Sequence, residues 1–236
     1  MTTEPEASPT PKKSVAREYL ESIVVAVILA LFIRTFAIQA FKIPTGSMEP
    51  NLLIGDHLLV NKLVYSPSFG PLEDRLLGKR PIERGHVVVF KYPDEPERDF
   101  IKRVIGLPGE TVEIRDKKVL IDGKPLEEPY AHFEPPLAHD DPVYGLRGEA
   151  VRDSWGPKVV PEGELLVLGD NRDNSRDSRF WGFLPRDQVK GRALIVYWSY
   201  NATREEYHRT GWVEWVKDTL SAFTRTRWER FFHVIR

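Results

Sequence analysis

One apolar run near the N-terminus divides this 236-residue chain into parts that must fold in different surroundings. Residues 23–33 carry no charge, and the apolar character continues beyond Arg34. A helix that crosses a bilayer needs roughly 20 apolar residues. Residues 20–41 supply that length if Glu21 and Arg34 are tolerated near the ends. We therefore predict a transmembrane anchor over residues 20–41, preceded by a disordered cytoplasmic tail over residues 1–19.

A cleavable secretion signal is the competing interpretation of the same run, because basic residues precede it. Arg34 interrupts the run where small residues should begin, and no clean A-x-A tripeptide follows, so we favour a retained anchor. Lys12, Lys13 and Arg17 favour a cytoplasmic N-terminus. The chain after the anchor is then predicted to lie on the outer, periplasmic or extracellular, face of the cytoplasmic membrane.

The remainder of the chain contains the short apolar segments that are typical of a β protein. Expected strands fall at residues 57–63, 86–92, 100–105, 111–115, 118–121, 165–168 and 193–200. Gly and Pro separate them, and Asp122-Gly123 is typical of a two-residue hairpin turn. We predict a mainly β fold, an antiparallel coiled-sheet, barrel-like or sandwich domain over residues 42–211.

Two segments differ from this strand pattern. Residues 127–161 lose periodicity and contain several prolines, which indicates an irregular insertion in the domain. Residues 212–236 carry aromatic side chains at helical spacing, among them Trp228, Phe231 and Phe232, with arginines around them. We predict a C-terminal amphipathic helix that either packs on the domain or lies on the membrane surface.

Composition excludes several classes of function. Lys and Arg number 34 against 35 Asp and Glu, which gives a net charge of -1 and no cationic field for nucleic acid. The chain has no cysteine. This excludes disulfides, thiolate metal sites and a cysteine nucleophile, and it suits a protein facing an oxidising compartment.

Ser47 is the first candidate for chemistry. A serine hydroxyl is a poor nucleophile at neutral pH and needs a base within hydrogen-bond reach. Gly46 before it permits a tight turn and close approach of a substrate backbone, and Thr45 offers a second hydroxyl. The G-x-S-x-G pattern of α/β-hydrolases is absent around Ser47. A plain turn between the anchor and the first strand is the alternative for this tripeptide.

Lys102 is the second candidate, because it lies inside an apolar predicted strand. Alternation along the strand places Lys102 on one face with Phe100 and Val104. Burial on that face would disfavour the charged amine, and a neutral lysine can accept the proton of a serine. A lysine that extends into solvent from an edge strand is the alternative.

Residues 168–179 form a polar segment too specific for an ordinary turn. Its Asp and Asn spacing superficially suggests a calcium loop, but the glycine and the terminal glutamate of an EF-hand are missing. Arginines alternate with the acidic residues. Internal salt bridges and a hydroxyl directed at the lysine fit this composition better.

Taken in order, these segments resemble bacterial type I signal peptidases, also called leader peptidases. The resemblance rests on Ser47 with Met48 and Pro50, and on the segment 100–110 that contains Lys102. Further matches are the loop 169–179, Gly55-Asp56 and the segment 84–90. It covers about residues 20–110 and 161–200 and implies a membrane-bound serine endopeptidase. Such an enzyme removes signal peptides with small residues at positions -1 and -3 from secretory preproteins.

The resemblance also implies roles for individual residues. Ser47 would be the nucleophile and Lys102 the general base. The Ser47 N–H and the Thr45 hydroxyl would form the oxyanion hole, where many relatives carry serine instead of threonine. Ser175 would orient Lys102, while Asp177 and Arg179 would hold the loop. The implied lining of the substrate pockets is Phe41, Ile43, Met48, Leu52 and Ile101. No metal or organic cofactor is implied, and the expected partners are preproteins and the lipid bilayer, with no nucleic acid.

Three rival interpretations are weaker. A Ser-His-Asp hydrolase could use His57 or His86, but neither lies in a recognisable catalytic motif. A self-cleaving repressor with a Ser-Lys pair would need a DNA-binding domain in place of the anchor. An inert relative that only binds from the membrane is opposed by the presence of Ser47, Lys102 and Ser175 together.

Overall fold

The structure is a computed structural model that describes residues 15–65, 80–133, 153–201 and 224–235. The chain divides into two compact units, Met1–Ala37 and Ile38–Arg236. Within the described part of the first unit, helix α1 spans Val15–Phe32 and continues as a π-helical turn over Ile33–Ala37. The apolar side chains of α1 are exposed.

The predicted anchor differs from this helix at both ends. Residues 15–19 of the predicted disordered tail are helical, because α1 begins at Val15, and residues 1–14 lie outside the described residues. No helix in the described part of the chain is both long enough and apolar enough to cross a membrane. Helical structure ends at Ala37, and Ile38–Lys42 form strand β1 instead. The predicted end of the anchor at Phe41 is therefore wrong. Residues 38–41 lie in β1, whose backbone groups form hydrogen bonds with strand β2. The topology across the membrane stays a prediction.

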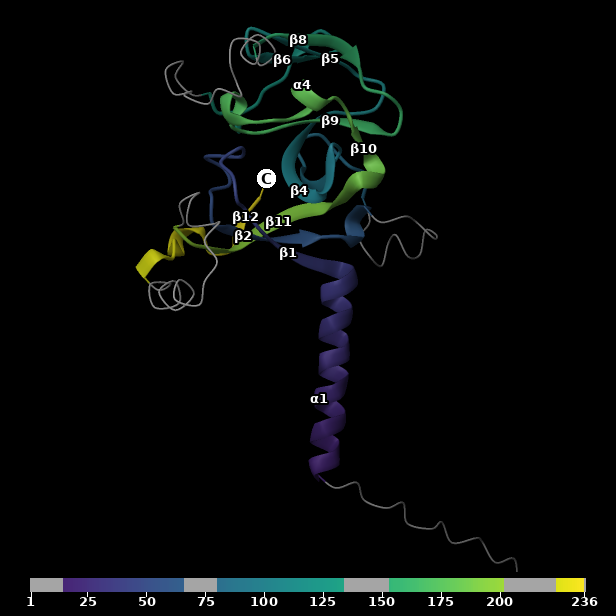
Figure 1. Ribbon diagram of the computed structural model, residues 1–236, viewed down its shortest axis with the longest axis vertical. Coiled ribbons are helices and arrows are strands. Elements are labelled where there is room, and N and C mark those ends of the chain that lie inside the picture. Colours follow the sequence, from purple (N-terminus) through teal and green to yellow (C-terminus); the bar gives the residue numbers. More distant parts are fainter. Residues whose placement is uncertain (1–14, 66–79, 134–152, 202–223, 236) are drawn as a thin grey trace, which may run out of the picture. The chain divides into compact units, whose positions relative to one another are not determined.

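The larger sheet of the second unit is antiparallel and has the order β1-β2-β11-β3-β4-β9-β10, with β12 paired to β11 (Figure 1). Its strands after β1 are β2 (Asp56–Asn61), β3 (Val87–Tyr92), β4 (Glu95–Gly106), β9 (Glu164–Leu168), β10 (Leu184–Pro185), β11 (Val189–Ser199) and β12 (His233–Val234). Strands β2 and β3 are consecutive in the sequence but do not pair, because β11 lies between them. The prediction of a mainly β antiparallel fold is confirmed.

A smaller sheet has the order β7-β6-β5-β8 and lies beyond β9 at the top of Figure 1. Its strands are β5 (Thr111–Arg115), β6 (Lys118–Ile121), β7 (Lys124–Pro125) and β8 (Trp155–Val159). Asp122 and Gly123 adopt positive φ angles of 49° and 75° between β6 and β7, so the predicted hairpin turn is confirmed.

Strand β8 corrects the prediction of an irregular insertion over residues 127–161. It pairs with β5 through Thr111 and Val159, and the side chain of Trp155 is buried in the core beneath the smaller sheet. Gly156 and Pro157 interrupt the apolar pattern and concealed this strand. Residues 134–152 of the predicted insertion lie outside the described residues.

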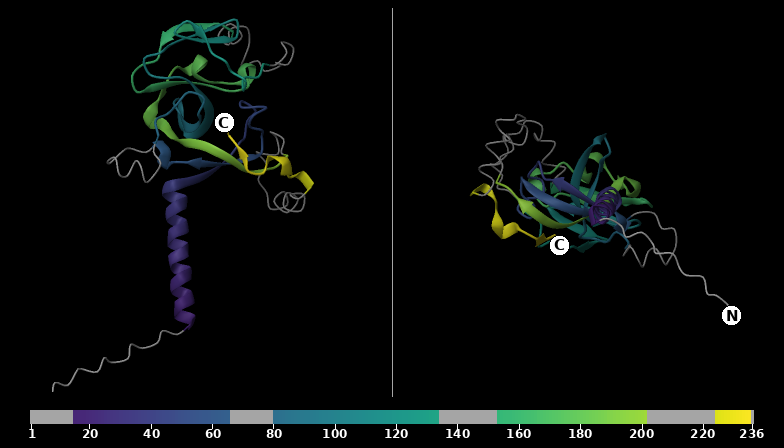
Figure 2. Two further views of the ribbon diagram at one scale, coloured as in Figure 1. Left: turned by 180° about the vertical axis from the view of Figure 1, so that it is seen from behind. Right: turned by 90° about the horizontal axis from the view of Figure 1, so that it is seen from below.

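Residues 224 and 225 are helical, but the described C-terminal segment from residue 226 onward is not the predicted amphipathic helix. Residues 228–230 form a single 3-10 turn, and the strand β12 follows. Backbone pairing with β11 replaces helical hydrogen bonds, and Ile235 is buried in the core. Figures 1 and 2 show this segment, in yellow, running beside β11. Residues 212–223 of the predicted helix lie outside the described residues.

Short helical turns complete the described part of the second unit. They are Leu63–Tyr65, Arg172–Asn174, the helix α4 over Ser178–Trp181, and Arg186–Gln188. Apolar side chains fill three core clusters. One cluster lies under the connection between β1 and β2 and includes Met48 and Leu52. This connection and strand β4 position the site.

Candidate active site

Ser47 lies on the connection between β1 and β2. We call this connection together with Asp56, the first residue of β2, the serine loop, residues 43–56. Backbone hydrogen bonds close the neck of this loop, from Ile43 N to Asp56 O at 2.8 Å and from Gly55 N to Ile43 O at 3.0 Å. Met48, fully buried, anchors the loop in the core. The side chain of Ser47 is therefore held at a defined place, and the residue is only 8% exposed.

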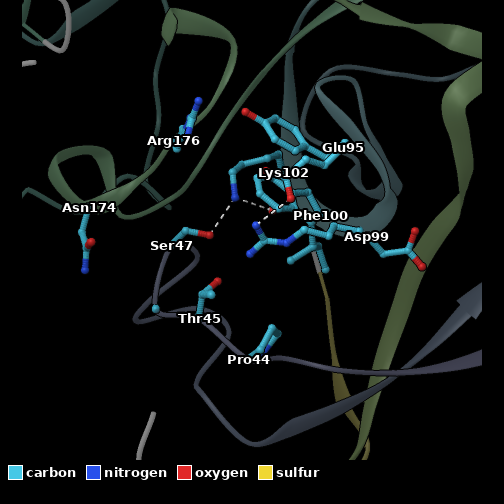
Figure 3. A pocket seen from close by; sticks show the side chains of 13 residues that line it. Pro44, Thr45, Ser47, Glu95, Asp99, Phe100, Lys102, Asn174 and Arg176 are labelled. Carbon is cyan, nitrogen blue, oxygen red and sulfur yellow. Dashed lines mark hydrogen bonds and ion pairs between the residues drawn. The ribbon is translucent and has the colours of Figure 1, made fainter. Parts of the chain in front are cut away.

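Lys102 lies in strand β4 and reaches Ser47 from the other half of the larger sheet. Its register partner in β3 is Val88, and the residue is 3% exposed. The Lys102 Nζ atom lies 2.7 Å from Ser47 Oγ and donates a second hydrogen bond to Ile101 O at 2.8 Å. Figure 3 shows the amine directed at the serine hydroxyl. The two residues are 55 positions apart in the sequence, and the fold brings them into direct contact.

Burial lowers the pKa of Lys102 from 10.5 to about 8, because the interior disfavours the charged ammonium. The carboxylates of Asp177 and Asp170 raise this pKa in part, and Arg179 lowers it. The amine is therefore neutral at mildly alkaline pH. A neutral amine in contact with a serine hydroxyl can take up its proton.

The polar loop, residues 169–177, packs against the backbone of Ser47. Asn171 N donates a hydrogen bond to Ser47 O at 3.1 Å. Gly169 lies so close that a Cβ atom placed on it would be 2.5 Å from Ser47 O. This distance is shorter than any ordinary contact, so only glycine allows the polar loop to approach the nucleophile in this way.

Asp177 and Arg179 lie together at the end of the polar loop. Asp177 is 0% exposed and accepts hydrogen bonds from Gly169 N at 3.0 Å and from Arg179 Nε at 2.8 Å. Arg179 Nη2 also donates to Arg172 O at 2.7 Å. Burial opposes ionisation of Asp177, but the Arg179 guanidinium holds its pKa below the usual range. The structure thus brings together the two residues expected to hold the loop.

The hydrogen bonds of Lys102 in the described residues go to Ser47 and to Ile101 O and do not include Ser175. Ser175 is 1% exposed, and its hydroxyl helps to hold the pKa of Asp177 below the usual range. The expected role of Ser175 in orienting the base therefore stays a prediction.

A pocket of about 340 Å³ opens on the Ser47–Lys102 pair. Thr45 lines it beside Ser47, and Figure 3 shows the two residues on the same loop. Of the residues expected to line substrate pockets, Ile101 lines this one. Ile43, Met48 and Leu52 lie in the buried core cluster that also contains Ile101, and Phe41 packs against it, so their place in substrate pockets stays a prediction. These four form part of the support beneath the site.

Sequence reasoning missed the residues that tie Lys102's strand to the polar loop. Arg103 is 2% exposed and binds Asp170 with two hydrogen bonds, of 2.8 Å and 2.7 Å. Asn51 Nδ2 donates to the same carboxylate at 2.9 Å, and the ring of Tyr130 lies 4.1 Å from the Arg103 guanidinium. An arginine inside an apolar strand was the available signal, since a buried guanidinium needs a carboxylate partner.

The predicted insertion also supports the polar loop. Arg172 pairs with Glu128, and their side chains are 3% and 8% exposed. His132 forms an isolated bridge with Asn171, with hydrogen bonds from His132 N to Asp170 O at 2.7 Å and from Arg172 N to His132 O at 2.9 Å. These contacts hold the residues that precede Ser175.

The two histidines considered as alternative bases lie elsewhere. His57 forms a hydrogen bond to Gly55 O at 3.1 Å and packs against Trp198, with ring centroids 4.8 Å apart and the rings tilted by 31°. His86 lies 2.7 Å from the Tyr65 hydroxyl. In the described ranges neither histidine bonds to Ser47, and no three His, Asp or Glu side chains gather as metal ligands. The geometry supports acyl transfer through a serine with a lysine base.

Comparison with known proteins gives consistent matches. The family model for "Signal peptidase, peptidase S26" matches residues 16–198. Signal peptidase I of Leptolyngbya laminosa is 40% identical over 210 residues, covering 86% of this chain and 89% of the relative. Signal peptidase I of Aquifex aeolicus is 37% identical over 229 residues, covering 78% and 84%. The crystal structure of a signal peptidase I from Enterococcus faecalis is 32% identical, covers 48% of this chain and 97% of that chain, and has a TM-score of 0.35.

Proposed function

Because this chain belongs to the signal peptidase family, peptidase S26, and is a serine endopeptidase that removes signal peptides, we propose that Ser47 is its nucleophile and Lys102 its general base. The 2.7 Å contact between the buried Lys102 amine and the Ser47 hydroxyl carries this proposal. The lowered pKa of Lys102 supports it, because a base must be neutral before it can accept a proton.

The reaction proceeds through an acyl-enzyme. Neutral Lys102 takes the proton of Ser47 as Oγ attacks the carbonyl carbon of the scissile peptide. The Ser47 N–H and the Thr45 hydroxyl stabilise the oxyanion of the tetrahedral intermediate. The Lys102 ammonium then gives its proton to the departing amine of the mature protein. Lys102, neutral again, takes a proton from a water whose oxygen attacks the ester carbon, and the ammonium returns this proton to Ser47 Oγ as the signal peptide is released.

The substrate is a secretory preprotein with small residues at positions -1 and -3. The pocket beside Ser47 is lined by Ile101 and Phe100, while Met48 and Leu52 support the serine loop from below. A filled core under the nucleophile leaves little depth for a large side chain. Ser175 contributes to holding the base through the polar loop, on which Asp177 and Arg179 are already fixed.

A pH profile tests the identity of the base. We expect kcat/KM for preprotein cleavage to rise about tenfold per pH unit below the pKa of Lys102, which is about 8, and to level off above it. The lowered pKa of Lys102 means that its neutral amine, the form that accepts the serine proton, becomes populated as the pH approaches 8. Activity must therefore increase with pH. The measurement is the initial rate of cleavage of one preprotein between pH 6 and pH 10, with product N-termini determined by mass.

A histidine base would give a different profile. Its activity would level off near or below about 6.5, the usual pKa of histidine, since burial lowers the pKa values of both His57 and His86. The variant His57→Gln serves as the control and should keep the profile of the wild type. A plateau that begins below pH 7 in the wild type contradicts the assignment of Lys102.

The N-terminal unit is proposed to attach the enzyme to the cytoplasmic membrane with its N-terminus inside. Exposed apolar side chains such as Ile23, at 59%, and Leu29, at 55%, support contact of α1 with lipid. A reporter that is active only outside the cytoplasm should be active when fused after Arg236. Digestion of the N-terminal tail by protease added outside intact spheroplasts would contradict this orientation.

A further inference from the structure

We propose that Arg230 is a positioning residue for the cleavage reaction, which it supports by holding the serine loop in place. This inference rests on the proposed role of Ser47 as the nucleophile. Arg230 lies in the C-terminal segment, residues 224–235, whose strand β12 runs beside β11 (Figures 1 and 2). It is separated from the serine loop by more than 170 positions but contacts it at two points.

The first contact is at the neck of the serine loop. Arg230 Nη2 donates to Asp56 Oδ2 at 2.6 Å, and Arg230 Nε donates to Asp56 Oδ1 at 3.2 Å. Asp56 is 0% exposed, and its carboxylate also accepts hydrogen bonds from Ser199 Oγ at 2.6 Å and Leu53 N at 2.9 Å. A buried carboxylate is costly without a cation. Arg230 makes the close ion pair with the residue whose backbone closes the neck against Ile43, while Arg227 Nη1 lies farther off, 3.8 Å from Asp56 Oδ1.

The second contact is in the middle of the serine loop. Arg230 Nη2 donates to Asn51 O at 2.9 Å. The side chain of Asn51 in turn donates to Asp170 at 2.9 Å, and Asp170 binds Arg103, the neighbour of Lys102 in β4. Arg230 thus holds the backbone of Asn51, the residue of the serine loop that is linked by hydrogen bonds through Asp170 to β4, the strand of Lys102.

The C-terminal segment is itself fixed on both sides of Arg230. Arg227 N donates to Ser199 O at 2.9 Å, and Arg227 Nη1 donates to Ile54 O at 3.1 Å. Ile235 N donates to Leu194 O at 2.9 Å, and the side chain of Ile235 shares a core cluster with Met48. Arg230 therefore reaches the serine loop from a rigid support.

Precise placement of the serine loop matters because Ser47 Oγ must stay within hydrogen-bond distance of Lys102. A displacement of about 1 Å in a catalytic group can cost about 10²-fold in rate. Arg230 touches neither Ser47 nor the pocket in the described ranges. Its loss should therefore lower kcat while leaving KM nearly unchanged.

The test compares Arg230→Met and Arg230→Lys in the full-length enzyme, with one preprotein as substrate. We expect Arg230→Met to lower kcat by about tenfold or more with KM changed by less than about threefold. Arg230→Lys keeps a cation opposite Asp56, but one ammonium group cannot reproduce both hydrogen bonds to Asp56 and the one to Asn51 O, so its kcat should fall between those of Arg230→Met and the wild type. Glu229→Gln changes the charge of an exposed neighbour and serves as the matched control, with kinetics like the wild type.

Folding is checked for each variant by near-UV circular dichroism at the assay temperature. Should Arg230→Met fail to fold, the double variant Asp56→Asn/Arg230→Met removes both charges and tests the same contact, with the same loss of kcat expected. A folded variant of either kind with the kcat of the wild type would overturn the inference, provided that Ser47→Ala is inactive. Cleavage by Ser47→Ala would instead overturn the proposed function.

Discussion

Replacing Lys102 with methionine is expected to lower kcat/KM for preprotein cleavage by about 10³-fold or more. Methionine has a similar length but no proton acceptor of useful basicity. Ser47→Ala should lose a similar factor, and the double variant should be no worse than either single one, because the two groups act as one unit. Lys102→Arg should also be inactive, since a guanidinium cannot deprotonate usefully. Initial rates at pH 9 with a purified preprotein provide the measurement.

The same Lys102→Met variant should be more stable than the wild type, which separates lost chemistry from lost folding. The pKa of Lys102 falls from 10.5 to about 8 on burial. Such a shift lowers the stability of the wild type by about 3 kcal/mol at pH 7, and the variant avoids this cost. The variant also lacks the hydrogen bonds of the amine, which are worth about 1 kcal/mol, so we expect its free energy of unfolding to be higher by about 2 kcal/mol. Below pH 8 both folded and unfolded wild type are protonated, and the cost is fully present.

The stability difference should then disappear with rising pH. Between about pH 8 and 10.5 the folded protein has lost the Lys102 proton while the unfolded chain still binds it. Wild-type stability therefore rises with pH in this window relative to the variant. Urea unfolding at pH 7 and at pH 10 gives the comparison, with Lys118→Met, at an exposed lysine, as the control. A Lys102→Met protein that is less stable at pH 7 contradicts the burial of a destabilised amine.

Gly169→Ala is expected to impair both folding and cleavage. The new methyl group would lie 2.5 Å from Ser47 O and 2.5 Å from Ser175 Cβ, so the polar loop must move away from the nucleophile. Overpacking of this kind costs about 1–3 kcal/mol, and the shift of the loop should lower kcat by about 10²-fold. Urea unfolding and preprotein cleavage measure the two effects.

Gly163→Ala is the matched control for this steric prediction. Gly163 has a positive φ of 77° and nothing within 4 Å of an added Cβ. Alanine there meets backbone strain of about 1 kcal/mol but no clash. We expect a modest loss of stability with unchanged kcat. If Gly169→Ala behaves like Gly163→Ala, the close approach of the polar loop to Ser47 is not required.

The parts of the fold predicted from the sequence are those fixed by local pattern. Alternation along residues 100–105 placed Lys102 on one face with Phe100 and Val104, and of the two alternatives for that face the structure shows burial, with Lys102 3% exposed. The turn at Asp122-Gly123 followed from residues that tolerate positive φ. These features depend on neighbours in the chain, so the sequence alone was sufficient to predict them.

Features set by distant partners were missed or wrong. The aromatic spacing before Ile235 suggested a helix, but pairing of β12 with β11 and the burial of Ile235 fix an extended backbone instead. Residues 38–41 of strand β1 were assigned to the anchor. The strand that pairs with them, β2, begins 14 residues after β1 ends, so nothing next to β1 in the sequence revealed the pairing. No local pattern shows which segment will supply the hydrogen bonds.

The same division applies to the candidate site. Resemblance and strand alternation pointed to Ser47 and Lys102, which the structure places in contact. The ion pair of Arg103 with Asp170 was missed because its partners are 67 positions apart. Met48 and Leu52, which were expected in the substrate pockets, are buried in the core cluster that also contains Ile101, so their place in the pockets stays a prediction.

The order of strands in the larger sheet also determines when the enzyme can become active during its synthesis. Ser47 follows β1 and Lys102 lies in β4, yet the halves β1-β2 and β3-β4 are joined in the described sheet by β11, which is made later. A nascent chain that ends before Val189 holds both groups without the strand that aligns them. Closing such a long loop is a slow step in folding. The ribosome therefore synthesises most of the chain before β11 can align Ser47 with Lys102.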